Sequence, residues 1–263
     1  MSIIHLSPLD LSIAAFLVVL LAGLTFMLRL GLAQQLFIAA ARTTVQLLLI
    51  GFVLTALFAH ARLIWVLIMA FIMLSIAGYE VMSRQRHRFT GWWGYSIGSF
   101  SMFISSFVVI LITLIVIIGP QPWYKPQYAI PLLGMLLGNT MNGIALCIDH
   151  LTNNAKQLRD VIEARLTLGQ SWSQAISDIE RDSTRVGMIP IINAMAAAGI
   201  ISLPGMMTGQ ILSGTSPLEA VKYQIMIMFL ITAGTGFGTI VAARLGARRL
   251  FDDRHRLRLD RLS

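Results

Sequence analysis

Seven long apolar stretches dominate the hydrophobic pattern of the chain, and most polar residues lie in the segments between them. A helix needs about 20 residues to cross the hydrocarbon core of a bilayer, which is roughly 30 Å thick. The apolar positions are continuous and do not alternate with polar ones, so the pattern predicts an all-α integral membrane protein with about seven transmembrane helices and excludes a membrane β-barrel. The predicted spans are Leu11–Leu28, Thr43–Ala59, Leu63–Met82, Tyr95–Ile118, Ala129–Ile148, Gly187–Met207 and Tyr223–Ala243.

Positive charge indicates the side of the membrane on which each connecting segment lies, because cytoplasmic segments carry an excess of Lys and Arg. Of the 20 Lys and Arg residues, all but three fall in one set of alternate connections or after the last span. The exceptions are Arg62, Lys125 and Lys222. We therefore predict an N-terminus outside and a C-terminus inside. The polar segment 149–186 and the basic tail 244–263 are predicted to be cytoplasmic.

Composition supports lipid as the surrounding solvent. Hydrophobic residues make up 56% of the chain and charged residues only 12%, whereas soluble domains carry about 25% charged residues. A net charge of +8 would fit a nucleic-acid-binding protein if basic residues alternated with aromatic ones on a polar face. Here the basic residues flank the apolar runs, so nucleic acid is not expected as a partner. Cys147 is the single cysteine and excludes a disulfide within the chain.

Residues 149–186 form the only long polar segment, and helix-capping patterns predict its structure. Two pairs match the capping box, in which a first side chain and a side chain three residues later bond each other's backbone N–H. The pairs are Asn154 with Gln157 and Ser171 with Gln174. Gly169 stands where a helix C-terminal glycine is expected. We predict a helix over Ala155–Leu168 and a second helix from Trp172 toward Thr184. Their apolar stripes are Leu158, Val161, Ile162 and Leu166 on the first, and Trp172, Ile176 and Ile179 on the second.

One motif in this segment indicates a partner protein. Residues 163–169, EARLTLG, resemble the EAA loop of ABC importer permeases, in which a Glu-Ala pair precedes a glycine at the seventh position. Arg165 replaces the alanine of that loop, and Arg181-Asp182 replaces its Leu-Pro. The resemblance implies a coupling element that docks on a separate ATPase. The alternative is an amphipathic helix at the membrane surface with a structural role only. The coupling residues implied are Arg159, Glu163, Ala164, Arg165, Gly169 and Trp172.

The absence of certain motifs limits the possible energy sources for transport by this chain. The chain has no GxxxxGK[ST] loop for nucleotide phosphates and no HExxH helix for a metalloprotease zinc. Buried carboxylates, which proton-coupled carriers need, are limited to Glu80 near the inner end of the third span and Asp149 just past the fifth. We therefore expect no enzyme activity and no cofactor in this chain, with ATP and Mg²⁺ bound by a partner ATPase.

Several strings together carry a family resemblance: GNTMNG at 138–143, EARLTLG followed by Trp172, IPIIN at 189–193 and ISLPGMMTGQILSG at 201–214. They resemble the FetB family of ABC-type iron-export permeases, whose plant relatives are associated with aluminium tolerance and with a nucleotide sugar. The resemblance covers essentially the whole chain. It implies one permease domain over 1–263 in the bacterial inner membrane, a FetA-like ATPase partner, and a permease homodimer in a two-plus-two complex. It also implies metal export and a link to oxidative-stress resistance. The alternatives are an ABC permease for an organic solute or nucleotide sugar, and a membrane scaffold that transports nothing.

A path for a soft or borderline cation would offer thioether, amide and carboxylate groups on facing helices. The candidates are Glu80, Asn139, Asn142, Asn193, Met195, Met206 and Met207, of which Glu80, Met206 and Met207 are the candidate metal ligands. Each has a simpler interpretation as well. Methionines pack in lipid, asparagines form hydrogen bonds between helices, and Glu80 can pair with Arg84 one turn on.

Glycine and proline mark candidate gates. Gly234, Gly236 and Gly238 are dense enough to indicate a moving or dimer-facing helix, and the alternative is close packing within the chain. Pro204 and Gly205 are expected to break the sixth span near its outer end, because proline lacks the N–H that continues a helix. Irregular backbone at that depth needs a protein or water-filled environment, so this break is the predicted outer gate.

Overall fold

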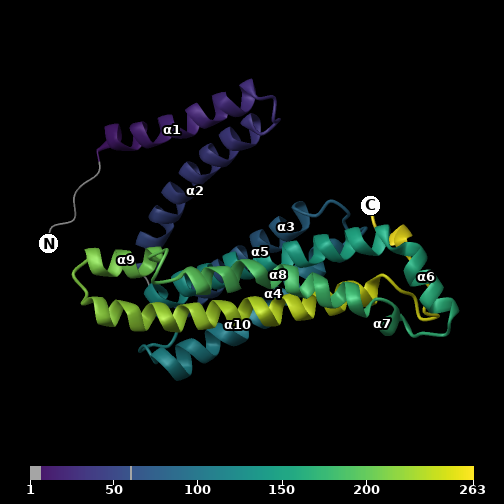
Figure 1. Cartoon of the computed structure of the whole chain (residues 1–263). Coiled ribbons are helices and arrows are strands. Elements are labelled where there is room, and N and C mark those ends of the chain that lie inside the picture. Colours follow the sequence, from purple (N-terminus) through teal and green to yellow (C-terminus); the bar gives the residue numbers. More distant parts are fainter. Residues whose placement is uncertain (1–6, 60) are drawn as a thin grey trace. The chain divides into compact units, whose positions relative to one another are not determined.

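The computed structural model describes residues 7–59 and 61–263, and this part of the chain is helical apart from isolated bridges (Figure 1). The long helices are α1 (Pro8–Met27), α2 (Ala33–Ala59), α3 (Leu63–Ser83), α4 (Trp93–Ile112), α5 (Pro126–Gln157), α8 (Ser177–Ala197) and α10 (Pro217–Arg249). The short elements are η1 (Thr113–Ile118), a π-helix, then α6 (Arg159–Thr167), α7 (Trp172–Ala175), α9 (Gly205–Leu212) and η2 (Leu259–Arg261), a 3₁₀-helix. The all-α prediction is confirmed for the described residues.

Six helices in the described part are long and apolar enough to cross a membrane: α1, α2, α3, α4 with η1, α5 and α10. They coincide with six of the predicted spans. The sixth predicted span, Gly187–Met207, is not one continuous helix, because α8 ends at Ala197 and α9 begins at Gly205. Gly199 has a φ of +83° in the connection, a conformation that ends a helix before Pro204 is reached. The count of seven spans stays a prediction.

The chain divides into two compact units, and the first contains α1 and α2. α1 begins with a capping box, in which the backbone N–H of Asp10 bonds the Ser7 hydroxyl and the Asp10 carboxylate accepts from the Ser7 N–H. α2 begins at Ala33 rather than at the predicted Thr43. Arg42 therefore lies inside a helix and not in a connection, which corrects its place in the charge pattern. Nearly all side chains of both helices are exposed.

The second unit contains the remaining helices, with α5 at its centre. α5 packs against α3, α4, α8 and α10, and its buried positions run along the whole helix. Figure 1 shows α5 and α10 running in the same direction. α8, which lies between them in the sequence, runs in the opposite direction. This arrangement brings both ends of the polar connection between α5 and α8 to one end of the bundle.

Small side chains let the central helices approach closely. A Cβ atom placed on Gly187 of α8 would lie 2.6 Å from the Gly143 carbonyl oxygen on α5. A Cβ atom on Gly238 of α10 would lie 2.7 Å from Cγ2 of Thr140 on α5. Buried hydroxyl residues lie on these helices and on α4 with η1, namely Ser101, Ser105, Ser106, Thr113, Thr140, Thr235 and Thr239. Between these helices the packing depends on van der Waals contact, because lipid offers no hydrophobic drive to associate.

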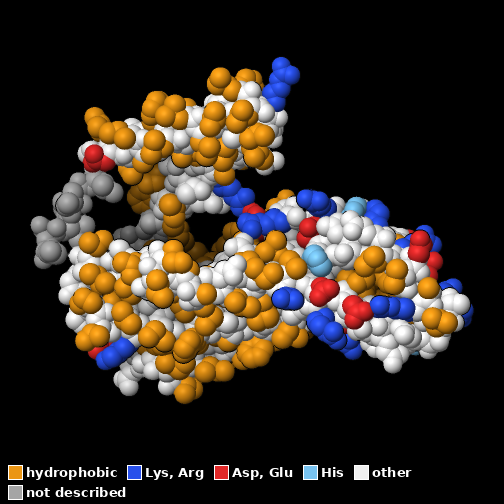
Figure 2. Space-filling model, in the orientation of Figure 1, with side chains coloured by type: hydrophobic (Ala, Val, Ile, Leu, Met, Phe, Trp, Pro, Cys, Tyr) orange, Lys and Arg blue, Asp and Glu red, His pale blue; other side chains and the backbone are white. Residues whose placement is uncertain are grey.

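Three polar segments meet at one end of the second unit, and we call residues 84–92, 158–176 and 250–263 together the polar end. The backbone N–H of Thr90 donates to the Arg261 carbonyl at 2.8 Å, and that of Trp172 donates to Nδ1 of His255 at 3.3 Å. Figure 2 shows charged side chains gathered at this end of the unit, while apolar side chains dominate the rest of the visible face. The grouping agrees with the charge pattern, which places all three segments on one side of the membrane.

Candidate coupling segment and substrate path

The predicted first helix of the coupling segment begins later than expected. Asn154 does not cap a new helix, because α5 continues through it to Gln157 and its amide donates to the His150 carbonyl at 2.9 Å. The chain turns at Leu158, and α6 is only nine residues long. Gly169 follows α6 with a φ of +88°, the left-handed conformation of a helix C-terminal glycine. The predicted end is therefore confirmed and the predicted start is wrong.

The second predicted helix begins as the capping pattern indicated. The Ser171 N–H donates to Oε1 of Gln174 at 3.0 Å, which completes a capping box ahead of Trp172. α7 is one short turn, and the chain then continues directly into α8. Ile176 and Ile179 are buried, as the apolar stripe predicted.

Arg165 joins the two arms of the coupling segment. Its guanidinium donates to the Ala175 carbonyl at 3.1 Å and to the Asp178 carboxylate at 2.8 Å. The departure from the EAA pattern thus has a structural role, because arginine at this position ties α6 to the start of α8 where alanine could not. Asp178 was not among the predicted residues, since no short spacing or periodicity links the two positions.

α6 has one buried side and one exposed apolar side. Ile162 is 1% exposed, whereas Leu158 and Val161, predicted to share its stripe, are 41% and 46% exposed. Leu168, just past the helix, is 83% exposed. The stripe therefore divides: Ile162 is buried, Leu166 is half-buried, and Leu158 and Val161 face outward.

Charged residues lie beside these exposed apolar side chains. Nε of Arg159 donates to Glu163 one turn on at 2.8 Å, and this bond to the carboxylate raises the pKa of Arg159. Both side chains are well exposed, so the pair adds little to the stability of the fold. Ala164 next to them is exposed too. We call Leu158, Arg159, Val161, Glu163 and Leu168 the α6 surface; it combines apolar and charged groups that a partner protein could cover.

Trp172 is enclosed by residues from the end of α10 and the tail. Its ring lies 6.0 Å from the ring of Phe251, and the guanidinium carbons of Arg244 and Arg248 lie 4.8 Å and 5.3 Å from its centroid. Its backbone N–H donates to Nδ1 of His255 at 3.3 Å. The sequence pointed to Trp172 but to none of these partners, which are too distant in the chain for any spacing signal.

Two candidate path residues are joined through one arginine. Nη1 of Arg84 donates to Oδ1 of Asn142 at 2.6 Å, and its Nε lies 3.8 Å from the Glu80 carboxylate. The structure thus contains the Glu80–Arg84 pair that was the simpler interpretation of Glu80. Asn139 is exposed one turn before Asn142 and donates to the Met135 carbonyl at 2.8 Å. Their role in a substrate path stays a prediction.

The other candidate ligands are spread along the bundle. Met195 on α8 accepts a hydrogen bond from Thr232 at 2.8 Å, whereas Asn193 is exposed. Met206 and Met207 lie on α9, at the end of the unit away from α6 (Figure 1). Glu80 lies in the last turn of α3, next to the polar end, so it is not close to these methionines. Among the described residues no group of three or more His, Cys, Asp or Glu could hold a metal ion.

The candidate gate glycines of α10 are buried inside the chain. A Cβ atom on Gly234 would lie 3.1 Å from Leu136, and one on Gly236 would lie 3.4 Å from Met188. Together with Gly238 they pack α10 against α4, α5 and α8. This position favours the packing alternative, and a hinge role stays a prediction.

The break near Pro204 is present and longer than expected. Residues 198–204 separate α8 from α9, and Gly205 is the first residue of α9. Ile200 and Ile201 in this connection are 89% and 84% exposed. Apolar side chains this exposed need lipid or protein around them, but a gate at this point stays a prediction.

Residues 8–251 match the model of a family described as "Uncharacterised protein family (UPF0014)". The match covers every helix from α1 to α10, including the coupling segment and all candidate path residues. The chain belongs to this family. The resemblance to the FetB family is confirmed as well, because a relative of that name is similar over nearly the whole chain.

Three relatives show how far the similarity extends. "UPF0014 membrane protein slr1647" of Synechocystis is 39% identical over 87% of this chain and 87% of its own length. "Probable iron export permease protein FetB" of Escherichia coli is 30% identical over 94% of this chain and 93% of its own length. "Protein ALUMINUM SENSITIVE 3" of Arabidopsis thaliana is 30% identical over 88% of this chain and 83% of its own length. No solved structure matches the chain.

Proposed function

We propose that this chain is the membrane-spanning permease subunit of an ABC transporter that exports iron or a related metal ion from a bacterial cell. The observation that carries the proposal is the 30% identity with the protein named as an iron export permease, which extends over 94% of the chain. Similarity of this length includes the membrane helices and the coupling segment alike. ATP would be hydrolysed by a separate FetA-like subunit that binds Mg²⁺ and nucleotide.

The α6 surface supports docking on such a subunit. It offers apolar groups flanked by an exposed ion pair, which is the composition of a protein interface with an apolar centre and a charged rim. Behind it, Ile162 and Arg165 connect α6 firmly to the bundle. A displacement of α6 would therefore be passed on to α5 and α8 instead of being absorbed by a loose loop.

The exposed faces of the helices support association with lipid and with further subunits. α1 and α2 are apolar along their length and nearly unburied. We include in the proposal a permease homodimer on two ATPase subunits in the bacterial inner membrane. The metal ions are the substrate, and their path would be lined by amide and thioether groups of α5, α8 and α9. Glu80 would lie near the cytoplasmic end of this path.

The test is transport by the reconstituted complex. The chain and its ATPase are placed together in proteoliposomes, and ATP-dependent movement of Fe²⁺ is followed with a trapped fluorescent chelator. We expect metal movement and metal-stimulated ATP hydrolysis, both absent when the ATPase carries an inactivated phosphate-binding lysine. If the chain binds the ATPase but ATP hydrolysis is stimulated by an organic solute or a nucleotide sugar and not by metal, the substrate is that organic compound and not a metal ion. Failure of the chain to bind an ATPase would leave the scaffold alternative instead.

A further inference from the structure

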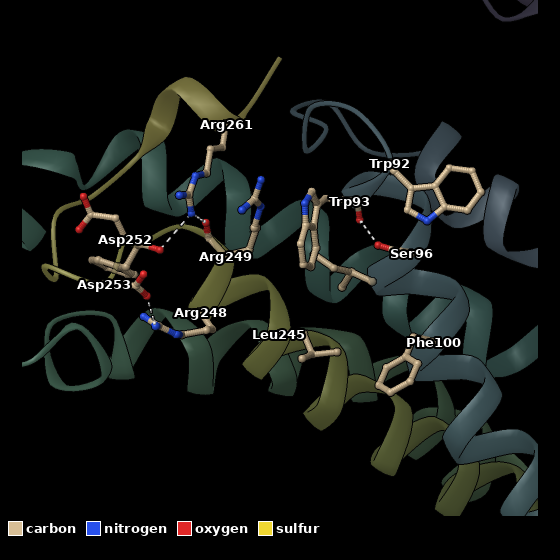
Figure 3. A pocket seen from close by; sticks show the side chains of 12 residues that line it. Trp92, Trp93, Ser96, Phe100, Leu245, Arg248, Arg249, Asp252, Asp253 and Arg261 are labelled. Atoms are coloured by element: carbon tan, nitrogen blue, oxygen red, sulfur yellow. Dashed lines mark hydrogen bonds and ion pairs between the residues drawn. The ribbon is translucent and has the colours of Figure 1, made fainter.

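A cavity of about 660 Å³ lies at the polar end, separate from the α6 surface and from the path residues. Its wall comes from the start of α4, the end of α10 and the residues that follow α10 (Figure 3). One side is apolar, with Trp93, Phe100 and Leu245, and the other side carries Arg249 and Arg261. The cavity therefore offers positive charge and apolar surface to the same occupant.

Arg249 lines the cavity between an aromatic ring and a second arginine. Its guanidinium carbon lies 4.4 Å from the centroid of Trp93, and its Nε is buried without a hydrogen-bond partner in the described structure. Arg261 donates to the carbonyl oxygens of Arg249 and Phe251 at 2.8 Å and 3.0 Å, which fixes a second guanidinium beside the first. Figure 3 shows Arg249 between Arg261 and the face of Trp93. Two guanidinium groups held side by side repel each other, so the arrangement favours an anion in the cavity that both can bind.

The two carboxylates of the cavity already have partners. Asp253 pairs with Arg248 at 2.9 Å, and Asp252 pairs with Arg256 at 2.8 Å. Backbone hydrogen bonds from Arg256 lower the pKa of Asp252, so this carboxylate stays ionised and engaged. Within the described residues no carboxylate forms an ion pair with Arg249 or Arg261, and the cavity retains their positive charge.

The apolar wall identifies the kind of anion. α4 and α10 are candidate membrane spans, so Phe100 and Leu245 lie where the cavity passes into the apolar part of the helices. Trp92 and Trp93 at the start of α4 are 76% and 49% exposed, as tryptophans at a membrane interface commonly are. Basic pockets between transmembrane helices on the cytoplasmic side suit anionic lipid head groups. A free phosphate ion would leave the apolar wall uncovered.

We infer that this cavity binds an anionic phospholipid. Its phosphate accepts hydrogen bonds from Arg249 and Arg261, and its glycerol backbone and upper acyl chains cover Trp93, Phe100 and Leu245. The bound lipid joins the start of α4 to the end of α10. Phe251, which also lines the cavity, contacts Trp172, so the same lipid supports the coupling segment. The site depends on the membrane location of the chain and not on which substrate it transports.

The first test uses the unmodified full chain in detergent. Phosphatidylglycerol, phosphatidylcholine and inorganic phosphate are added separately, and binding is measured by native mass spectrometry and by the shift in melting temperature. We expect a resolved complex and stabilisation with phosphatidylglycerol only. Equal binding of phosphatidylcholine, which carries the same phosphate but no net charge, would overturn the preference for an anionic lipid. Equal stabilisation by inorganic phosphate would overturn the lipid assignment in favour of a soluble anion.

The second test locates the site. Arg249→Gln removes one charge from the cavity and should weaken phosphatidylglycerol binding about tenfold, the effect of losing a hydrogen bond to a charged group. Arg254→Gln is the matched control, because Arg254 lies in the same tail but does not line the cavity. Trp93→Leu keeps the charge and removes the aromatic platform, so it tests the site if Arg249→Gln does not fold. Equal losses in Arg249→Gln and Arg254→Gln, or full binding by Trp93→Leu, would show that the lipid binds elsewhere by charge alone.

Discussion

Gly187→Leu is expected to abolish folding of the chain into a stable bundle. A Cβ atom at this position would lie 2.6 Å from the Gly143 carbonyl oxygen and 2.9 Å from both Cβ of Cys147 and Cγ2 of Thr239. The nearest atom belongs to the backbone of α5 and cannot rotate away, so α5 and α8 would have to separate. Overpacking by a single small group costs about 1–3 kcal/mol, and a leucine adds three further carbons. Size-exclusion profiles and melting curves of the detergent-solubilised chain measure the loss.

The matched control is Gly138→Leu on α5. A Cβ atom there would meet nothing within 4 Å, and the position has an ordinary helical backbone. We expect Gly138→Leu to migrate as a single peak with a melting temperature near that of the unmodified chain, and Gly187→Ala to lie between the two leucine variants. A normal profile for Gly187→Leu would contradict the close contact between α5 and α8.

Glu163→Lys is expected to weaken association with the ATPase strongly while the chain still folds and inserts. The change converts the exposed Arg159–Glu163 pair into two like charges on the α6 surface. The new positive charge would also repel any basic group of the ATPase that faces Glu163, so we expect affinity for the ATPase to fall at least about tenfold. The fold should be little affected, because exposed ion pairs contribute roughly 0–1 kcal/mol to stability. Co-purification with the tagged ATPase measures the effect, and the melting temperature verifies the fold.

Glu219→Lys provides the matched control for this reversal. Glu219 is also an exposed glutamate in a local ion pair, with Lys222 at 2.7 Å, but it lies at the start of α10, away from the polar end. Its reversal should leave ATPase binding unchanged. If both reversals weakened binding equally, or if neither did, the α6 surface would not be the docking site.

The hydrophobic pattern predicted the membrane helices well because twenty consecutive apolar residues have few alternatives to a span. It predicted helix boundaries wrongly where a local sequence pattern and the packing of the whole bundle favour different boundaries. Asn154 matches a capping box, but it lies inside α5, which continues to Gln157. A residue within a continuous helix does not act as an N-cap. Gly187–Met207 is apolar apart from Asn193 and Ser202, so hydropathy could not reveal that the chain leaves the helix at Ala198.

The coupling segment shows the same division between local and distant information. Gly169 and Ser171 were predicted correctly because a left-handed glycine and a capping box are properties of a few adjacent residues. The partners of Trp172 and Arg165 were not predicted, since Phe251 and Asp178 reach them only through the packing of the whole unit. The lipid cavity is likewise formed by helix ends that are far apart in the sequence.

The ion pairs in and beside the polar end have a consequence for the solution conditions in which the chain is handled. Arg165–Asp178, Arg244–Glu180 and Arg248–Asp253 each include a side chain that is at least half exposed. The Debye length falls from about 10 Å at 0.1 M salt to about 3 Å at 1 M, so these attractions weaken as ionic strength rises. The glycine and hydroxyl contacts between α5, α8 and α10 carry no net charge and are insensitive to salt. Ionic strength therefore acts selectively on this molecule, loosening the part that meets water while the part that meets lipid keeps its packing.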